Sequence, residues 1–133
     1  MYRFLLLLAM VFLHIVDDYY LQGWLASAKQ KSWWEQNAPD KMYKSDYIMA
    51  LFIHSFSWTF MIMIVPSIYT LITTSNIDIA SFVIIPIFII NLYIHMITDD
   101  MKANMKKINL IQDQLTHLVQ IAITWVILVV FGI

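Results

Sequence analysis

The 133-residue chain contains no cysteine, only two glycines and three prolines, and few charged residues, at 13% of the total. Without cysteine, disulfide scaffolds, thiolate metal sites and cysteine nucleophiles are excluded. The chain also has no glycine-rich phosphate loop and no nucleophile elbow of the GxSxG type. The net charge of -1 provides no basic field, so we expect no nucleic-acid partner.

Apolar residues are what the chain has in excess. They make up 61% of the sequence, against about 45–50% in an ordinary soluble domain. A soluble domain of this length leaves a large share of its surface in water and could not bury so much apolar area. We therefore expect the lipid bilayer to be the main partner.

Four stretches are long enough to cross the roughly 30 Å hydrocarbon core, which takes about 20 apolar residues per helix. They are residues 2–22, 47–73, 79–99 and 109–131. Short connections predict an all-α, integral membrane, antiparallel four-helix bundle that forms one domain over residues 1–133. Pro66 and Pro86 lie inside the second and third stretches, where we expect kinks rather than breaks. The tryptophan-rich segment 23–46 predicts an interfacial helix or aromatic belt.

The lysines predict an orientation. The first and third connections contain all seven, and the opposite side has only Arg3. By the positive-inside rule, these connections face the cytoplasm and both termini face outward, which fits a bacterial inner membrane. A cleaved signal peptide is the alternative for the N-terminal stretch, since Ala26-Ser27-Ala28 imitates a cleavage site. We favour a retained span, because two aspartates and a long interval precede that site.

Each predicted span contains one histidine, and three of the four histidines have an aspartate four residues away. The histidines are His14, His54, His95 and His117, and the pairs are His14–Asp18, His95–Asp99 and Asp113–His117. A spacing of four places both members on one face of a helix. The order is reversed in the fourth span, as expected for an antiparallel bundle that brings all the pairs to one depth near the cytoplasmic face.

Such a layer favours a metal ion. An ionised carboxylate in the bilayer costs at least about 2.5–3.5 kcal/mol, so a cation is expected beside it. Nitrogen and oxygen ligands without sulfur suit a divalent ion, zinc first, with manganese, iron or nickel as alternatives. The predicted ligands are His14, Asp18, His54, His95, Asp99, Asp113 and His117. Asp18 and Asp99 are also the predicted catalytic residues.

Several polar residues are predicted to orient these ligands from behind. They are Gln22, Gln114 and Lys102, together with Tyr19, Tyr93, Thr98 and Asn104. Asp17 and Asp100 are instead predicted to be helix-end carboxylates that face headgroups or water. A single histidine in a span is more often a packed, hydrogen-bonded residue than a ligand, and only the coincidence of four favours a site.

The four motifs occur in the order of a known family. The runs His14-Ile-Val-Asp17-Asp18-Tyr-Tyr-Leu21-Gln22, His54-Ser55, His95-Met-Ile-Thr-Asp99-Asp100-Met-Lys102 and Asp113-Gln114-Leu-Thr-His117 resemble the domain-of-unknown-function family number 3307. These are small phage and bacterial membrane proteins, distantly similar to inner-membrane proteins described as metal-dependent hydrolases. The resemblance implies that Asp18 and Asp99, rather than Asp17 and Asp100, are the family positions. Where some members have a second histidine in helix two, this chain has Trp58.

The sequence therefore favours a membrane-embedded, divalent-metal-dependent hydrolase of a small or amphiphilic substrate. A carrier or channel for metal ions or protons is the first alternative, since ionisable residues inside membranes commonly mark such pathways. A four-helix haem protein and a phage-encoded membrane interaction protein also remain open. The sequence does not decide the number of ions or the oligomeric state.

Overall fold

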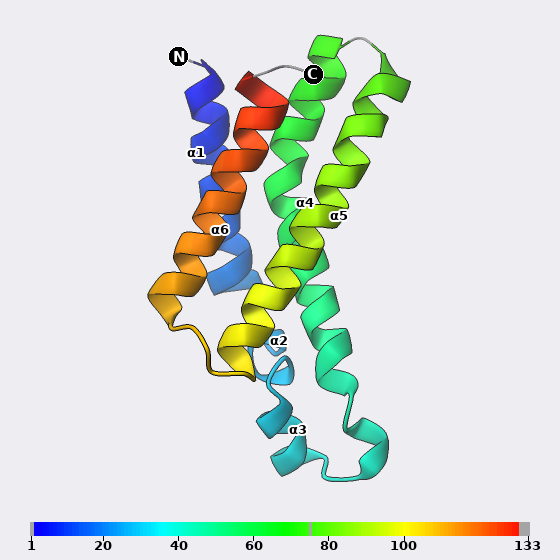
Figure 1. The fold of residues 1–133 in the computed structure, drawn as a ribbon, viewed down its shortest axis with the longest axis vertical. Coiled ribbons are helices and arrows are strands. Elements are labelled where there is room, and N and C mark those ends of the chain that lie inside the picture. Colours follow the sequence, from blue (N-terminus) through cyan, green and yellow to red (C-terminus); the bar gives the residue numbers. More distant parts are fainter. Residues whose placement is uncertain (1, 75, 131–133) are drawn as a thin grey trace.

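The computed structural model describes residues 2–74 and 76–130, and this part of the chain is helical with no strand (Figure 1). The elements, in order, are α1 (Tyr2–Ile15), η1 (Val16–Leu21), α2 (Leu25–Ala28), α3 (Lys31–Asn37), η2 (Lys41–Tyr43), α4 (Asp46–Thr74), α5 (Ile77–Ala103), α6 (Leu110–Trp125) and η3 (Val126–Val130). The turns η1 and η3 are π-helical continuations of α1 and α6, and η2 is a 3₁₀ turn.

Four helical stretches are long and apolar enough to cross a membrane: Tyr2–Leu21, Lys41–Thr74, Ile77–Ala103 and Leu110–Val130. They confirm the all-helical prediction and match the four predicted stretches, although the predicted end at residue 131 lies outside the described residues. In Figure 1 they lie side by side, each running opposite to the one before. The third stretch continues to Ala103, so that Asp99, Asp100 and Lys102 are all helical.

The two prolines inside long helices do not interrupt them. Helix α4 continues through Pro66 and α5 through Pro86, as predicted. In α4, the Thr70 hydroxyl donates to the Pro66 carbonyl at 2.9 Å and lies 3.3 Å from the Leu128 carbonyl. This hydroxyl links α4 to the end of the fourth span.

Helix α6 begins with a capping box. The Asn109 side chain accepts a hydrogen bond from the Gln112 backbone N–H, and the Gln112 side chain accepts one from the Asn109 backbone N–H, both at 3.0 Å. This reciprocal pairing satisfies two backbone donors at the helix start. It fixes where α6 begins and thereby places Asp113 in the first turn.

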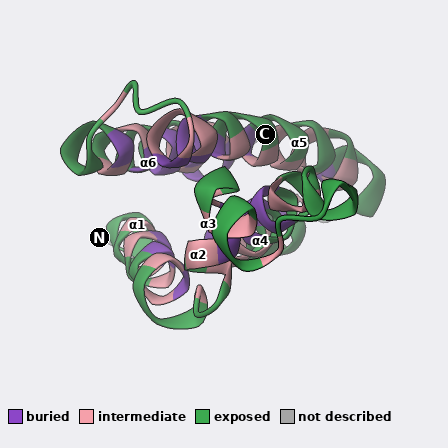
Figure 2. Ribbon diagram, turned by 90° about the horizontal axis from the view of Figure 1, so that it is seen from below, coloured by how far each residue is buried: buried purple, intermediate pink, exposed green. Residues whose placement is uncertain are grey.

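The segment between the first two spans folds across one end of the bundle (Figure 2). Gly23 reverses the chain after η1 in the left-handed region, with φ 48°, a conformation that glycine adopts without steric cost. The Asn104 side chain, at the end of α5, donates to the Lys29 carbonyl and accepts from the Lys31 N–H. These bonds hold α2 and α3 against the end of α5.

The predicted aromatic belt is a compact cluster on this segment. Neighbouring rings of Trp24, Trp33, Trp34 and Tyr43 lie 5.0 to 6.3 Å apart, measured between centroids. The Trp34 indole N–H donates to the Ala28 carbonyl at 2.7 Å. The cluster thus packs α3 against the end of α2, which positions Lys29.

Burial in the bundle is the reverse of that in a soluble protein. Large apolar side chains such as Phe82 and Ile72 are exposed along the outside, and buried polar residues outnumber buried apolar ones among the described residues. The apolar core lies toward the chain ends, in what we call the upper half. It consists of Met10, Trp58, Ile62, Met63, Ile121, Leu128 and Val129. The lower half, next to α2 and α3, contains the buried charges.

Candidate metal centre

All four histidines meet in the lower half of the bundle, each from a different long helix. The ring centroids of His54 and His95 lie 5.1 Å apart, those of His95 and His117 lie 4.2 Å apart, and those of His14 and His117 lie 5.8 Å apart. All four rings are buried. The juxtaposition expected from one histidine per span is therefore present.

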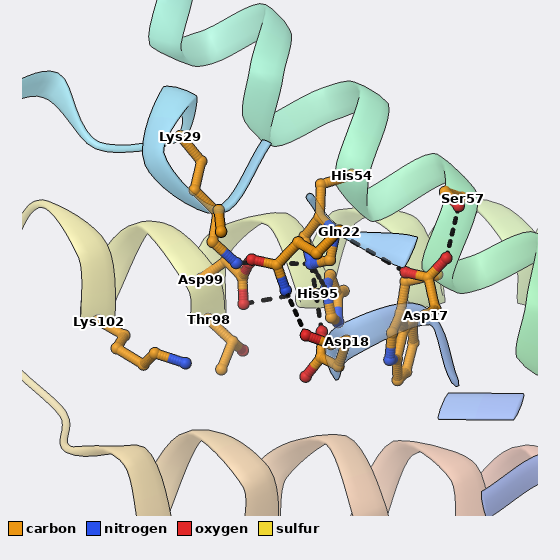
Figure 3. Close-up of polar contacts among 12 residues, drawn as sticks. Asp17, Asp18, Gln22, Lys29, His54, Ser57, His95, Thr98, Asp99 and Lys102 are labelled. Atoms are coloured by element: carbon orange, nitrogen blue, oxygen red, sulfur yellow. Dashed lines mark hydrogen bonds and ion pairs between the residues drawn. The ribbon is translucent and has the colours of Figure 1, made fainter. Parts of the chain in front are cut away.

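Asp18 and Asp99 point toward His54 and His95 (Figure 3), and Asp113 faces His117. The Nε2 atom of His54 lies 3.3 Å from Asp18 Oδ1 and 3.3 Å from Asp99 Oδ2. The Nε2 atom of His117 lies 3.5 Å from both Asp99 Oδ1 and Asp113 Oδ1. Imidazole nitrogens and carboxylate oxygens from four helices thus surround a common centre.

Two overlapping groups of side chains could each hold a metal ion. One consists of Asp18, His54 and His95, and the other of His95, Asp99 and His117, with the ligand atoms in each within 4.8 Å of one another. His95 belongs to both groups. The nitrogen and oxygen donors suit a divalent ion such as zinc.

The hydrogen bond of His117 leaves its Nε2 directed toward carboxylates. The Gln120 amide nitrogen donates to the Asn91 carbonyl at 3.2 Å, so the Gln120 oxygen is the atom that lies 3.3 Å from His117 Nδ1. Nδ1 therefore carries a hydrogen, and Nε2 is the ring atom that faces the carboxylates of Asp99 and Asp113. Nε2 and Asp113 Oδ1 have no hydrogen-bond partner. A cation between them would satisfy both atoms, and such a bond from the far nitrogen is typical of metal-binding histidines.

His54 is held between carboxylates on its two edges. Asp17 Oδ2 lies 3.7 Å from His54 Nδ1, while Asp18 and Asp99 face Nε2. Asp17 is itself fixed by the Ser57 hydroxyl, which donates to its Oδ1 at 2.5 Å. A carboxylate facing Nδ1 favours the tautomer whose Nε2 is available to an ion.

Two lysines partly compensate the buried acids. Lys29 Nζ lies 2.6 Å from Asp99 Oδ2, and Lys102 Nζ lies 2.5 Å from Asp113 Oδ2. Lys29 is buried and reaches the centre from the end of α2 (Figure 3). With neutral imidazoles, the four carboxylates of Asp17, Asp18, Asp99 and Asp113 exceed the two ammonium groups by two negative charges. That excess equals the charge of one divalent cation.

His14 does not belong to either candidate group, contrary to its prediction as a ligand. Its Nδ1 accepts a hydrogen bond from the Trp58 indole at 2.7 Å, and its Nε2 lies 3.1 Å from Gln114 Oε1. Both ring nitrogens are therefore engaged, and no lone pair is left for an ion. His14 instead anchors the side chains around the centre.

Trp58 links the centre to the apolar core. Its ring stacks on His95 with centroids 4.1 Å apart and an interplanar angle of 19°, while its N–H holds His14. Trp58 thus orients two imidazoles, those of His14 and His95. The Nε2 atoms of His54 and His95 lie 3.2 Å apart, beside the carboxylates of Asp18 and Asp99.

Of the residues predicted to orient ligands, Gln114 and Lys102 contact the acids directly. The Gln114 amide donates to Asp18 Oδ2 at 2.9 Å and to Asp113 Oδ2 at 3.2 Å. Gln22 donates instead to the Asp18 backbone carbonyl, and Asn104 holds Asp100 and the α2–α3 segment. Thr98 is buried, but its hydroxyl donates to the Ile94 carbonyl.

Two tyrosines predicted for this role are exposed: Tyr19 at 57% and Tyr93 at 61%. Because their rings face outward, the prediction that they support the centre is wrong. The face of a helix that a tyrosine occupies depends on the neighbouring packing, which the spacing to a histidine alone does not define.

The prediction that Asp17 faces headgroups or water is also wrong, since only 1% of this residue is exposed. The cause is the π-helical turn η1, which contains both Asp17 and Asp18. A π-helix has more residues per turn than an α-helix, so the 3.6-residue periodicity misplaces side chains here. Both consecutive aspartates consequently face inward. Asp100, by contrast, is half-buried at the edge and accepts from Asn104.

Comparisons of the chain with protein-family models, with curated proteins and with solved structures find no match. The chemistry of the centre therefore has to be judged from its geometry.

Proposed function

We propose that this chain is an integral membrane hydrolase that depends on a divalent metal ion, with the lysine-rich end on the cytoplasmic side of a bacterial inner membrane and both termini outside. The observation that carries this proposal is the pair of buried atoms His117 Nε2 and Asp113 Oδ1, which lie 3.5 Å apart without a hydrogen bond in a centre where carboxylates outnumber ammonium groups. Zinc is the ion we expect first. The resemblance to family 3307 points to the same class of protein.

His54, His95, His117, Asp18 and Asp99 would hold the ion. Asp113, which we also predicted as a ligand, lies outside these two groups, but its Oδ1 would face the ion beside His117 Nε2. A bound divalent ion lowers the pKa of water toward about 7 and so supplies a nucleophile at neutral pH. Gln120 and Asp17 would orient two of these ligands. Gln120 faces Nδ1 of His117, and Asp17 faces Nδ1 of His54. Lys29 pairs with Asp99 at 2.6 Å and holds that carboxylate in place.

Asp18 is suited to accept the proton of the attacking water. Gln114 holds its Oδ2, whereas its Oδ1 is buried without a hydrogen-bond partner. Oδ1 lies 3.3 Å from His54 Nε2, on the side of the proposed ion, and the bond at Oδ2 fixes its position for proton transfer. In ester or phosphoester hydrolysis, the water oxygen would bond to the acyl carbon or phosphorus, and this proton would then pass to the departing alkoxide. Asp99, which we predicted as a second catalytic residue, would serve mainly as a ligand.

A carrier along the bundle is less well supported. A path for ions or protons would have to continue through the upper half, where Met10, Ile62 and Ile121 are fully buried and pack together. Beyond the Asn91–Thr124 pair, the fourth span has the apolar run Trp125–Val130. This packing favours a fixed site at one depth.

The test is metal analysis of protein purified in mild detergent, with two matched variants on neighbouring residues. Asp99→Asn removes a ligand of the centre, whereas Asp100→Asn changes the adjacent carboxylate, which contacts Asn104 instead. We expect a stoichiometric divalent metal in the wild type and in Asp100→Asn, and its loss in Asp99→Asn. His95→Ala should lose it as well, because His95 belongs to both groups.

The hydrolase would be ruled out if the wild type held no transition metal and His95→Ala behaved like the wild type. Proton or metal-ion uptake into proteoliposomes, without hydrolysis, would instead support the carrier.

A further inference from the structure

A groove runs along the outside of the bundle between the first and fourth spans, directly beside the metal centre. It has a volume of about 540 Å³. Its lining consists of Val11, His14, Ile15, Tyr19, Tyr20, Gln114 and Leu118. Ile15, Tyr20 and Leu118 are exposed on the outer surface, which in a membrane faces lipid. A molecule in the bilayer could therefore enter this groove sideways.

The groove is apolar at one end and more polar at the other, as a lipid molecule is. Its deep end is purely apolar, at Val11 and Leu118, while its shallow end is lined by Tyr19 and Tyr20. Exposed tyrosines are typical of the membrane–water interface. The nine steps from Val11 to Tyr20 extend at most about 13 Å, at the α-helical rise of about 1.5 Å per residue. The groove thus runs along the spans from the hydrocarbon toward the depth of the lipid headgroups.

The polar wall of the groove is also the outer wall of the metal centre. Gln114 is half-buried and lines the groove, while its amide holds Asp18 and Asp113. His14, the other polar lining residue, is bonded to Gln114. These two side chains separate the groove from the proton-accepting Asp18. An ester group at their level would be one side chain away from Asp18, across Gln114.

We propose that this groove binds one acyl chain of a glycerophospholipid from the surrounding bilayer and presents the ester end of that lipid at Gln114. This lipid site rests on the proposed hydrolytic function, and it narrows the substrate class from amphiphiles in general to membrane lipid. The acyl chain lies against Val11, Ile15 and Leu118, and the glycerol end reaches the level of Tyr19 and Tyr20. Since the chain leaves one apolar medium for another, its binding depends on close packing and on the polar end rather than on hydrophobic transfer.

The test fills the groove without touching the centre. Leu118→Trp places a large ring on the lining, whereas Leu115→Trp places the same ring on an exposed position of α6 outside it. Each protein is exchanged into phosphatidylglycerol with brominated acyl chains, washed in detergent, and analysed by native mass spectrometry for retained lipid. Metal content and lipid hydrolysis are measured on the same samples.

We expect the wild type and Leu115→Trp to retain one brominated lipid per chain and Leu118→Trp to lose it, with unchanged metal content in all three. Leu118→Trp should also lose hydrolysis of the long-chain lipid but keep that of a short-chain soluble analogue. Equal retention by the two variants would overturn the lipid site while leaving the metal centre in place. A wild type that retains lipid at the groove but contains no metal would refute the proposed function alone.

Discussion

The two halves of the bundle are built from the same long helices and are held together in opposite ways. In the upper half, Met10, Ile62 and Leu128 are fully buried in an apolar core that needs no partner outside the chain. In the lower half, the same helices contribute imidazoles and carboxylates whose nearest contacts are other charged or polar groups. The upper half is held by apolar packing, whereas the lower half contains buried polar atoms that have no hydrogen-bond partner.

This difference shows how a small, apolar helical bundle can bury charged side chains. The apolar half fixes the helices relative to one another, so that the polar half need not supply the folding energy itself. Trp58 lies at the boundary and belongs to both, since its ring packs in the core while its N–H holds His14. The cost of buried charge is thereby confined to one depth.

The largest effect should come from the one buried lysine that reaches the centre from outside the long helices. In metal-free protein, Lys29→Met leaves Asp99 without its partner, and breaking a buried ion pair costs about 3–5 kcal/mol of unfolding free energy. Because a competing positive charge is gone, the ion should also bind more tightly. Thermal unfolding with and without added zinc measures both effects.

Lys31→Met is the matched control, since Lys31 is exposed on the same segment. We expect it to leave stability and zinc dependence unchanged. If Lys29→Met unfolded at the wild-type temperature without metal, the lower half would not depend on charge compensation.

A smaller effect is expected behind His117. Gln120→Leu removes the oxygen that accepts from His117 Nδ1, and the loss of such a supporting bond typically lowers metal affinity by about 10–100-fold. Gln120→Glu keeps an acceptor at that position and should retain the ion. Zinc titration by calorimetry measures the affinities, and equal weakening by both variants would contradict the assigned tautomer.

The smallest effect should be found in the upper half. Ile62→Val removes one methylene from a fully buried side chain, which costs about 0.5–1.5 kcal/mol. Its zinc affinity should equal that of the wild type, because no ligand moves. A change in zinc affinity from this variant would show that the two halves are coupled more tightly than their separate contacts indicate.

Much of the fold follows from the sequence because long apolar runs and one histidine per run are local signals. The spacing of four that joins His95 to Asp99 and Asp113 to His117 survives in the structure, since α5 and α6 are regular there. Lys29 was not predictable in this way, because its position depends on how Gly23 and Asn104 fold the connecting segment back onto α5.

Two errors had different physical causes. His14 has the right spacing to Asp18, but whether a ring nitrogen is free depends on neighbours distant in sequence, here Trp58 and Gln114. Asp17 was misplaced because η1 departs from α-helical periodicity. Pattern analysis assumes that periodicity and has no means of detecting a π-helical turn.

The turn η1 has one more consequence. Its two adjacent aspartates face opposite edges of the His54 ring: Asp17 lies near Nδ1 and Asp18 near Nε2. Both side chains face inward because a π-helical turn contains more residues than an α-helical one. The placement of the two aspartates therefore depends on the number of residues in η1 and not only on their identity. Deleting one residue of Val16–Leu21 would therefore leave almost every side chain of the site in the sequence and still remove the contacts of Asp17 and Asp18 with His54.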